Sequence, residues 1–154
     1  MNIRTKQVGF TLIELLLVIS IIGILFGLTT INLVNAQTST SIVTSKNMLI
    51  ADLKSQQTKA INGIDGSGSF GVHFSSNNRY TLFRGASFAG ASSIFSVSID
   101  GNISFSGNDI IFSPVTGEIQ GFSNTAPPTI TVANTVGLGQ KVIIFNRYGV
   151  VIQD

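Results

Sequence analysis

Near its start the chain has an almost unbroken hydrophobic run over residues 10–34, in which Glu14 is the one charged residue. Its twenty-five residues exceed the ~20 that a helix needs to cross a bilayer, so the run predicts a membrane-spanning helix. Arg4 and Lys6 precede the run, and no basic residue follows it closely. By the positive-inside rule, this asymmetry predicts a single-pass protein with its N-terminus in the cytoplasm and residues 35–154 outside.

The pattern changes over residues 35–62, where polar residues appear but neither proline nor glycine interrupts the chain before Gly63. Apolar positions recur there at helical spacing and form one stripe. We therefore expect one continuous helix over residues 10–62, whose second half is amphipathic and packs on a globular head. The stripe consists of Ile42, Leu49, Leu53 and Ala60, with Ile50 and Ile61 beside it.

From Gly63 onward, short runs of β-branched and aromatic residues separated by turn formers predict strands. Asp100-Gly101 is a two-residue hairpin signal, because a type I′ turn needs positive φ angles at its two central residues and both aspartate and glycine tolerate them. Residues 146–149 predict a second hairpin. The expected fold class is α+β, with the long N-terminal helix packed on an antiparallel β-rich head of one sheet or two packed sheets. The predicted strands are Phe70–Phe74, Arg79–Arg84, Ile94–Ile99, Ile103–Phe105, Ile110–Phe112, Glu118–Phe122, Thr129–Val132, Val142–Asn146 and Val150–Ile152.

Composition agrees with one domain and an appendage. The chain has 154 residues, 44% of them hydrophobic and 10% charged, and the charged share lies well below the ~25% usual for soluble domains. Its formal net charge is +2, but without residues 1–9 seven basic residues face seven acidic ones, so bulk charge does not imply a nucleic-acid partner. The absence of cysteine excludes disulfides, thiolate nucleophiles and cysteine-ligated metal sites.

These patterns divide the chain into four segments. We expect a short basic leader over residues 1–9, a hydrophobic transmembrane helix over residues 10–34, its amphipathic continuation over residues 35–62, and the β-rich head over residues 63–154.

The most informative motif is Gly9-Phe10-Thr11-Leu12-Ile13-Glu14. A carboxylate inside an apolar membrane segment costs about 2–3 kcal/mol on insertion scales, so it usually has a partner or a function. With the basic leader before it and LLLVISIIGIL after it, the motif resembles the class III prepilin signature of type IV pilins and type II secretion pseudopilins. In this resemblance Gly9 precedes the cleaved bond, Phe10 becomes the N-methylated first residue, and Glu14 matches the family's acidic position.

The resemblance implies a non-enzymatic structural subunit without a cofactor. A prepilin peptidase of the membrane would remove residues 1–9, and an assembly platform driven by an ATPase would extrude the subunits into a homo- or heteropolymer. Before assembly the subunit would reside in the cytoplasmic (inner) membrane of a bacterium. Afterwards it would form part of a cell-surface filament, or fimbrium, or of a periplasmic pseudopilus.

Glu14 and Phe10 together suggest what sets the axial position of one subunit relative to the next in a filament. Cleavage after Gly9 would leave a positive α-amine on Phe10, four residues before Glu14. The carboxylate can then be compensated by the N-terminus of its own helix, or by the amine of a neighbouring subunit. Pairing between subunits would set their axial stagger, although a buried ion pair adds little net stability.

The head carries a second resemblance. The segments over residues 112–117, 130–132 and 143–149 are similar to the C-terminal pattern of H-type pseudopilins and related minor pilins. Major and minor subunit roles both stay open, as do pilus, competence and secretion systems.

Two other interpretations fit the N-terminal segment. A secretory signal peptide would have its small-residue cleavage site at Val34-Asn35-Ala36, but Glu14 and the length of the apolar run argue against it. A plain single-pass anchor of a β-domain protein explains neither Gly9 nor Glu14.

An alternative function is a filament-tip minor pilin that binds DNA or a surface, in competence or adhesion. Basic residues on the head could converge on DNA, and aromatic residues beside them could stack on bases. The basic residues are Arg79, Arg84, Lys141 and Arg147, and the aromatic ones are Tyr80, Phe83 and Tyr148.

No residue pattern predicts catalysis or a metal site. Residues 66–71 match GxGxxG, but no strand is expected before them and no helix after them, so we interpret these glycines as turn residues. His73 is the only histidine and lies in an alternating strand, which favours a structural role over a ligand or a catalytic base.

Overall fold

The computed structural model describes residues 9–64, 66, 68–75, 78–99, 101–136 and 139–153. For residues 28–38 it describes the backbone only. The predicted leader therefore lies outside the described residues except for Gly9, and Asp100 lies outside them as well.

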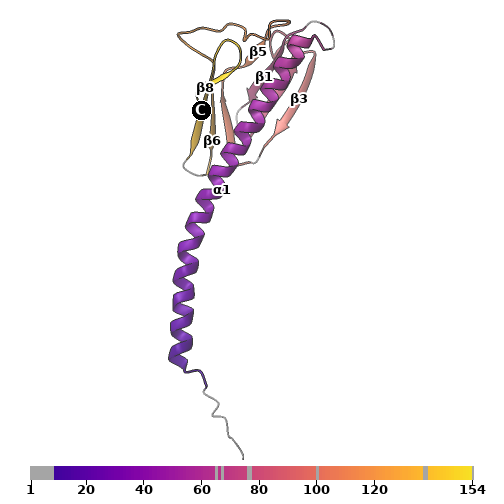
Figure 1. Ribbon diagram of the computed structural model, residues 1–154. Coiled ribbons are helices and arrows are strands. Elements are labelled where there is room, and N and C mark those ends of the chain that lie inside the picture. The colour runs from indigo at the N-terminus through magenta and orange to yellow at the C-terminus, as the bar shows by residue number, and fades with distance from the viewer. Residues whose placement is uncertain are drawn as a thin grey trace, which may run out of the picture. The chain divides into compact units, whose positions relative to one another are not determined.

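One α-helix, α1 (Leu12–Asn62), covers all but the first two of the residues predicted to be helical (Figure 1). The chain divides into two compact units, Met1–Gln37 and Thr38–Asp154, and α1 contributes to both. The continuous helix expected over residues 10–62 is thus confirmed, starting two residues later. It ends where Gly63 adopts a positive φ of 62°, which glycine tolerates without strain.

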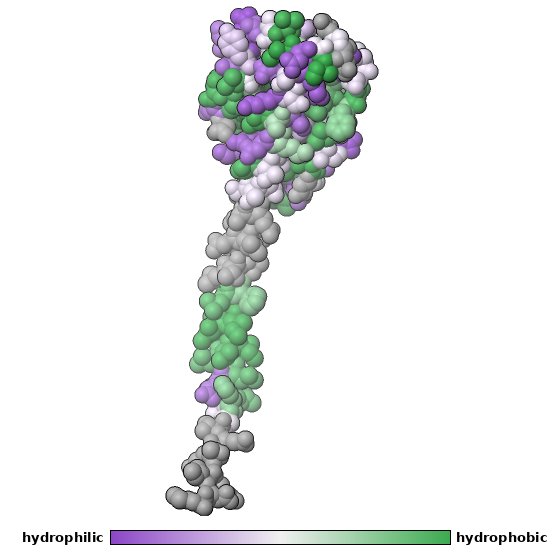
Figure 2. Space-filling view, turned by 45° about the vertical axis from the view of Figure 1, so that its right-hand side comes forward, coloured by the Kyte–Doolittle hydropathy of each residue, from purple (hydrophilic) through white to green (hydrophobic). Residues whose placement is uncertain are grey.

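In the first unit, the large apolar side chains of α1 from Leu12 to Phe26 are exposed, and Figure 2 shows many of them on one face. Within the described residues, no helix is both long enough and apolar enough to cross a membrane.

The second unit contains two antiparallel four-stranded sheets, so the fold class is α+β as predicted. The first sheet has the strand order β3-β2-β1-β5 and the second has the order β4-β6-β7-β8. The first sheet is formed by β1 (Phe70–Ser75), β2 (Arg79–Arg84), β3 (Ser93–Ser98) and β5 (Ile110–Phe112), and the second by β4 (Ile103–Gly107), β6 (Thr129–Asn134), β7 (Gln140–Phe145) and β8 (Val151–Gln153).

The predicted stripe on α1 packs against both sheets. Ile42, Leu49, Leu53 and Ala60 are buried in one hydrophobic cluster with side chains from both sheets. Ile50 packs against this cluster, whereas Ile61 is largely exposed. The helical segment of this unit lies across the strands, with β6 and β8 on one side and β3 on the other (Figure 1). The strand residues of the cluster include Phe70, Val72, Phe105, Ile110, Phe112, Ile130, Val132, Ile143 and Phe145.

Polar contacts also join α1 to the strands and loops. The Tyr80 hydroxyl donates to the Asp52 carboxylate at 2.5 Å. The Gln57 side-chain amide donates to the backbone carbonyls of Gly117, at 2.8 Å, and Tyr148, at 2.7 Å. Each bond pairs a group of α1 with a segment far away in sequence, so the bonds fix where α1 lies on the strands.

The hairpin predicted at Asp100-Gly101 is wrong. β3 pairs with β2 in the first sheet, and β4 pairs with β6 in the second, so the connection passes from one sheet to the other. Val97 and Ile103, on either side of the connection, are both buried in the core. Burial of these side chains against different partners outweighs the local preference for a tight turn.

The strand predicted over residues 118–122 is also wrong. Gly117 and Gly121 adopt positive φ angles of 66° and 67°, which bend the backbone at both ends of the segment. Only an isolated bridge forms, between Ile119 and Phe112. The other eight strands lie within two residues of their predicted bounds. The hairpin predicted at residues 146–149 is confirmed, because β7 and β8 pair across it.

Candidate functional site

The helix start is organised by Thr11 and Glu14. Glu14 Oε2 accepts hydrogen bonds from the backbone N–H of Thr11 at 2.9 Å and from its hydroxyl at 2.9 Å. In return, the backbone N–H of Glu14 donates to Thr11 Oγ1 at 3.3 Å. This reciprocal arrangement is a capping box, in which two side chains satisfy backbone donors that have no partner within the helix.

The capping box gives Glu14 a local role that sequence reasoning missed. The signal was present as the pattern of threonine followed three residues later by glutamate, just before an apolar run. The carboxylate lies in the first turn of α1, where the helix dipole favours negative charge. Its compensation by an amine on Phe10 stays a prediction.

Gly9 and Phe10 lie just before the capping box and are open to solvent. Phe10 is 83% exposed, and a Cβ added to Gly9 would meet no described atom within 4 Å. Packing among the described residues therefore gives no reason for glycine at position 9. Any requirement for glycine must come from outside these residues, as recognition by a peptidase would.

The helix after the capping box presents apolar side chains in all directions. Leu12 and Ile13 are exposed by 81% and 73%, and the exposed large apolar residues continue to Phe26. The Ser20 hydroxyl donates to the Leu16 carbonyl at 2.8 Å, so even this polar side chain is satisfied within the helix. A helix that is apolar all round is stable only where other apolar groups surround it.

The four basic residues considered for DNA contact lie on different parts of the second unit. Arg79 and Arg84 occupy opposite ends of β2, with Arg84 placed 6.0 Å from the centre of the Phe70 ring. Lys141 lies in β7 of the other sheet. Arg147 follows β7 and pairs with Glu118 at 2.9 Å. DNA contact by these residues stays a prediction.

The aromatic residues proposed to stack on bases are mostly unsuited to it. Tyr80 and Phe83 are fully buried, so that part of the prediction is wrong. The two residues face opposite sides of β2. The Tyr80 hydroxyl donates a hydrogen bond to Asp52 of α1. The Phe83 ring meets the Phe88 ring edge-on, with 5.7 Å between the ring centres. Tyr148 is 60% exposed.

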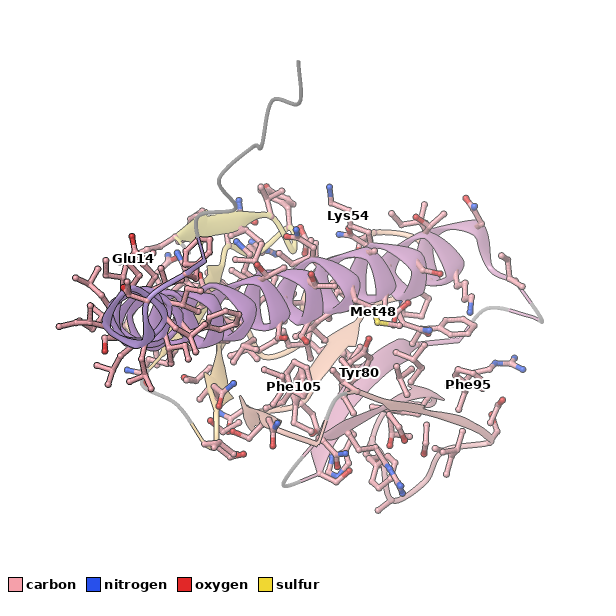
Figure 3. The ribbon with its side chains drawn as sticks, turned by 90° about the horizontal axis from the view of Figure 1, so that it is seen from below. Glu14, Met48, Lys54, Tyr80, Phe95 and Phe105 are labelled. Atoms are coloured by element: carbon pink, nitrogen blue, oxygen red, sulfur yellow. The ribbon has the colours of Figure 1, made fainter. Side chains whose placement is uncertain are left out.

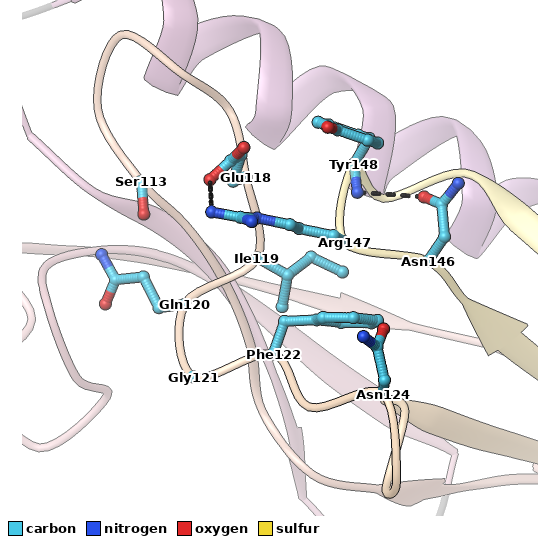
Figure 4. Close-up of a pocket in the computed structure, with 10 residues that line it drawn as sticks. All are labelled: Ser113, Glu118, Ile119, Gln120, Gly121, Phe122, Asn124, Asn146, Arg147 and Tyr148. Carbon is cyan, nitrogen blue, oxygen red and sulfur yellow. Dashed lines mark hydrogen bonds and ion pairs between the residues drawn. The ribbon is translucent and has the colours of Figure 1, made fainter.

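An open hollow of about 800 Å³ lies beside the ion pair of Glu118 and Arg147 (Figure 4). Its walls come from the segment after β5 and from the turn between β7 and β8, where the Tyr148 N–H donates to Asn146 Oδ1 at 3.0 Å. Because Glu118 neutralises the guanidinium, the hollow offers no net positive charge to a polyanion.

His73 and the glycines of residues 66–71 are placed as structural elements. The His73 ring stacks on Phe88 at 3.9 Å, and its Nδ1 lies 2.7 Å from Asp109 Oδ1. Helix α1 precedes Gly66 and strand β1 follows it, which is the reverse of the order required for a dinucleotide-binding loop.

Comparison with known families identified one match. The family model described as the prokaryotic N-terminal methylation motif matches residues 4–30, which include Gly9, Phe10 and the capping box. Comparison of the chain with curated proteins and with solved structures found no match.

Proposed function

Residues 4–30 carry the class III prepilin signature of type IV pilins and pseudopilins, and from this premise we propose that the chain is a structural subunit of a type IV pilus-like or type II secretion filament. It is made as a prepilin, a prepilin peptidase cuts it after Gly9, and the new N-terminus at Phe10 is methylated. The mature chain then assembles with other pilin-like subunits, as a pilin, a minor pilin or a pseudopilin.

The observation that carries this proposal is the coincidence of the methylation motif with an exposed, all-round apolar helix. Such a helix needs apolar surroundings on every side. In this proposal the membrane supplies them before assembly, and the helices of neighbouring subunits supply them inside the filament. An assembly platform and its ATPase move the subunit from the cytoplasmic membrane to a cell-surface or periplasmic fibre.

The second unit serves in this proposal as the head that the filament displays. Its polar contacts tie α1 to loops and strands, as those of Gln57 and Tyr80 do. The subunit acts by assembly and not by catalysis.

Substitution of Gly9 tests the proposal. We expect Gly9→Ala and Gly9→Val to block maturation, so that mass spectrometry of the membrane fraction finds the chain with residues 1–9 still attached. Gly101→Ala is the matched control, because Gly101 is also exposed and a Cβ there meets nothing within 4 Å. Unchanged cleavage of both Gly9 variants would contradict the proposal, as would a native N-terminus at Gln37.

A further inference from the structure

Two strand edges in the second unit have no described segment beside them. The outer edge of β5 is covered, because the Gln120 N–H donates to the Ile111 carbonyl at 2.8 Å. β4 lies beside β1 and β2 of the other sheet, where the Phe105 ring meets the Tyr80 ring edge-on with 5.3 Å between the ring centres. β3 ends the first sheet and β8 ends the second, and among the described residues neither pairs with a further strand.

The backbone of β3 has groups available for another strand. The Ile99 N–H donates to the Asn78 carbonyl at 2.9 Å, which marks a hydrogen-bonded pair just beyond the end of β3. Because such pairs alternate along an antiparallel ladder, the register makes Ser98, Ser96 and Ile94 the non-hydrogen-bonded positions. Their N–H and C=O groups therefore point away from β2.

The side chains of β3 do not protect this edge. The strand SIFSVS contains no charge and no proline, and its ladder with β2 has no bulge, although these are the usual devices that block edge pairing. Ile94 and Phe95 are 56% and 67% exposed. Phe95 also flanks a hollow of about 350 Å³ between α1 and β2, where Leu82 and Ile64 add apolar surface. Figure 3 shows Phe95 at the margin of the strands, away from the core residues Tyr80 and Phe105.

The edge at β8 has matching chemistry. Val150 and Ile152 are exposed, and Tyr148 adds a third exposed apolar surface next to them. The strand Val151–Gln153 carries no charge, but it is three residues long and its ladder with β7 shifts register between Ile144 and Phe145, so pairing along this edge is limited to a short segment. Within the described residues both edges are uncharged and carry exposed apolar side chains, so they can pair without desolvating a charged group.

We propose that β3 of one subunit pairs with β8 of a second copy, so that strand addition joins the heads within the filament. The two edges belong to different sheets, so the contact is head-to-tail and leaves one free β3 and one free β8 at the ends. A head-to-tail contact forms a ring if its rotation closes and an open chain if it does not, and a filament requires the open chain. The inference rests on the proposed filament function and adds the surface through which the heads meet.

Cysteine crosslinking of full-length protein in assembled filaments tests the pairing, because the natural chain has no cysteine. Ser96→Cys and Ile152→Cys place thiols at the centres of the exposed strands. With a short bismaleimide, we expect the double variant to give a ladder of multimers and each single variant to give none. Cleavage of the leader and recovery of sheared filaments are measured for every variant.

The outcomes separate the two proposals. Normal cleavage and normal filaments without a ladder would overturn the β3–β8 contact and leave the filament function intact. Crosslinked dimers of the Ser96→Cys single variant would show that β3 pairs with β3 of a second copy. That result would also overturn the β3–β8 contact. Failure of the cysteine-free chain to be cleaved or assembled would instead contradict the filament function.

A proline at Ser98 gives a second test. In the double-cysteine background, Ser98→Pro removes an N–H that points away from β2, so the pairing of β3 with β2 is preserved. Loss of one backbone hydrogen bond should lower crosslinking about tenfold. Ser98→Thr retains the N–H and should crosslink normally. An undiminished ladder from Ser98→Pro with an unchanged circular dichroism spectrum would overturn the proposal.

Discussion

At the scale of single residues, Glu14 combines two functions that can be separated. Its Oε2 caps the helix through Thr11, and its charge is available to an amine in the proposed filament. The first function needs only a hydrogen-bond acceptor, which glutamine also supplies in capping boxes. The second needs a negative charge.

We predict that Glu14→Gln and Glu14→Ala both prevent filament assembly while insertion into the membrane and cleavage continue. Leaving an amine without its buried partner costs about 3–5 kcal/mol, which lowers assembly far more than tenfold. Immunoblots of sheared filaments, compared with the membrane fraction, measure the loss.

Thr11→Ala is the matched control. It removes the cap hydroxyl at a cost of about 1 kcal/mol but keeps the charge of Glu14, so filaments should still form. Assembly by Glu14→Gln at the normal level would show that the cap, and not the charge, is what assembly requires.

Tyr80 is the second residue whose chemistry can be tested. Burial, followed by the hydrogen bond to Asp52 and the charge of that carboxylate, raises the pKa of Tyr80 above its ordinary value near 10. When folding raises the pKa of an acid, the protonated group stabilises the fold. This stabilisation is complete at pH values below the pKa of the group in the unfolded chain, and it decreases as the pH rises above that pKa.

We predict that Tyr80→Phe lowers the free energy of unfolding of residues 38–154 by about 1–3 kcal/mol at pH 7, because Asp52 loses its hydrogen-bond donor. Above about pH 10, the difference between the wild-type and Tyr80→Phe proteins should shrink as the unfolded tyrosine ionises. Urea denaturation over a pH series measures both effects. Tyr148→Phe, which changes an exposed hydroxyl, should stay within about 0.5 kcal/mol, and an equal loss from both variants would contradict the assignment.

At the scale of elements, α1 has two kinds of surface. Before Gly27 its described side chains are exposed on all sides, whereas from Ile42 onward one stripe is buried. Burial of this stripe is what stabilises the packing of α1 on the strands, since the exposed side of the helix makes few apolar contacts.

We predict that Leu49→Ala lowers the free energy of unfolding of residues 38–154 by about 2–5 kcal/mol, because Leu49 is fully buried in the core cluster. Met48→Ala is the matched control on the same turn of α1. Its side chain is 48% exposed, so the change should stay near 0.5 kcal/mol. Comparable destabilisation by the two substitutions, measured by urea denaturation, would contradict the orientation of α1.

At the scale of the whole molecule, charge argues against polyanion binding. Residues 38–154 contain seven Lys and Arg against six Asp and Glu, which leaves a formal charge of +1. The four basic residues considered for DNA contact are divided between two sheets, and Arg147 is already paired.

We predict that residues 38–154 bind single-stranded DNA no more tightly than ~10⁻⁴ M at physiological salt, the weak end of non-specific binding. Fluorescence anisotropy over a salt series measures it, with Arg79→Ser and Lys141→Ser as comparison variants. Tight, salt-dependent binding that both variants weaken would restore the DNA-binding alternative.

Local pattern alone was enough for the elements and the motif. The helix, its stripe and eight strands were predicted because helical and strand periodicities are properties of neighbouring residues. The prepilin signature was recognised by its resemblance to a known family, which was possible because its residues lie within one short segment. The capping box was readable in the same segment, although it was missed.

Only the tertiary structure decided which strands share a sheet, because each pairing depends on residues far apart in sequence. It placed the segments on either side of Gly101 in different sheets, buried Tyr80 and Phe83, and separated the four basic residues. The sequence by itself therefore determined the helix, the strands and the maturation motif, whose physics is local. Long-range burial and pairing decided the surface of the head, including the open edges at β3 and β8.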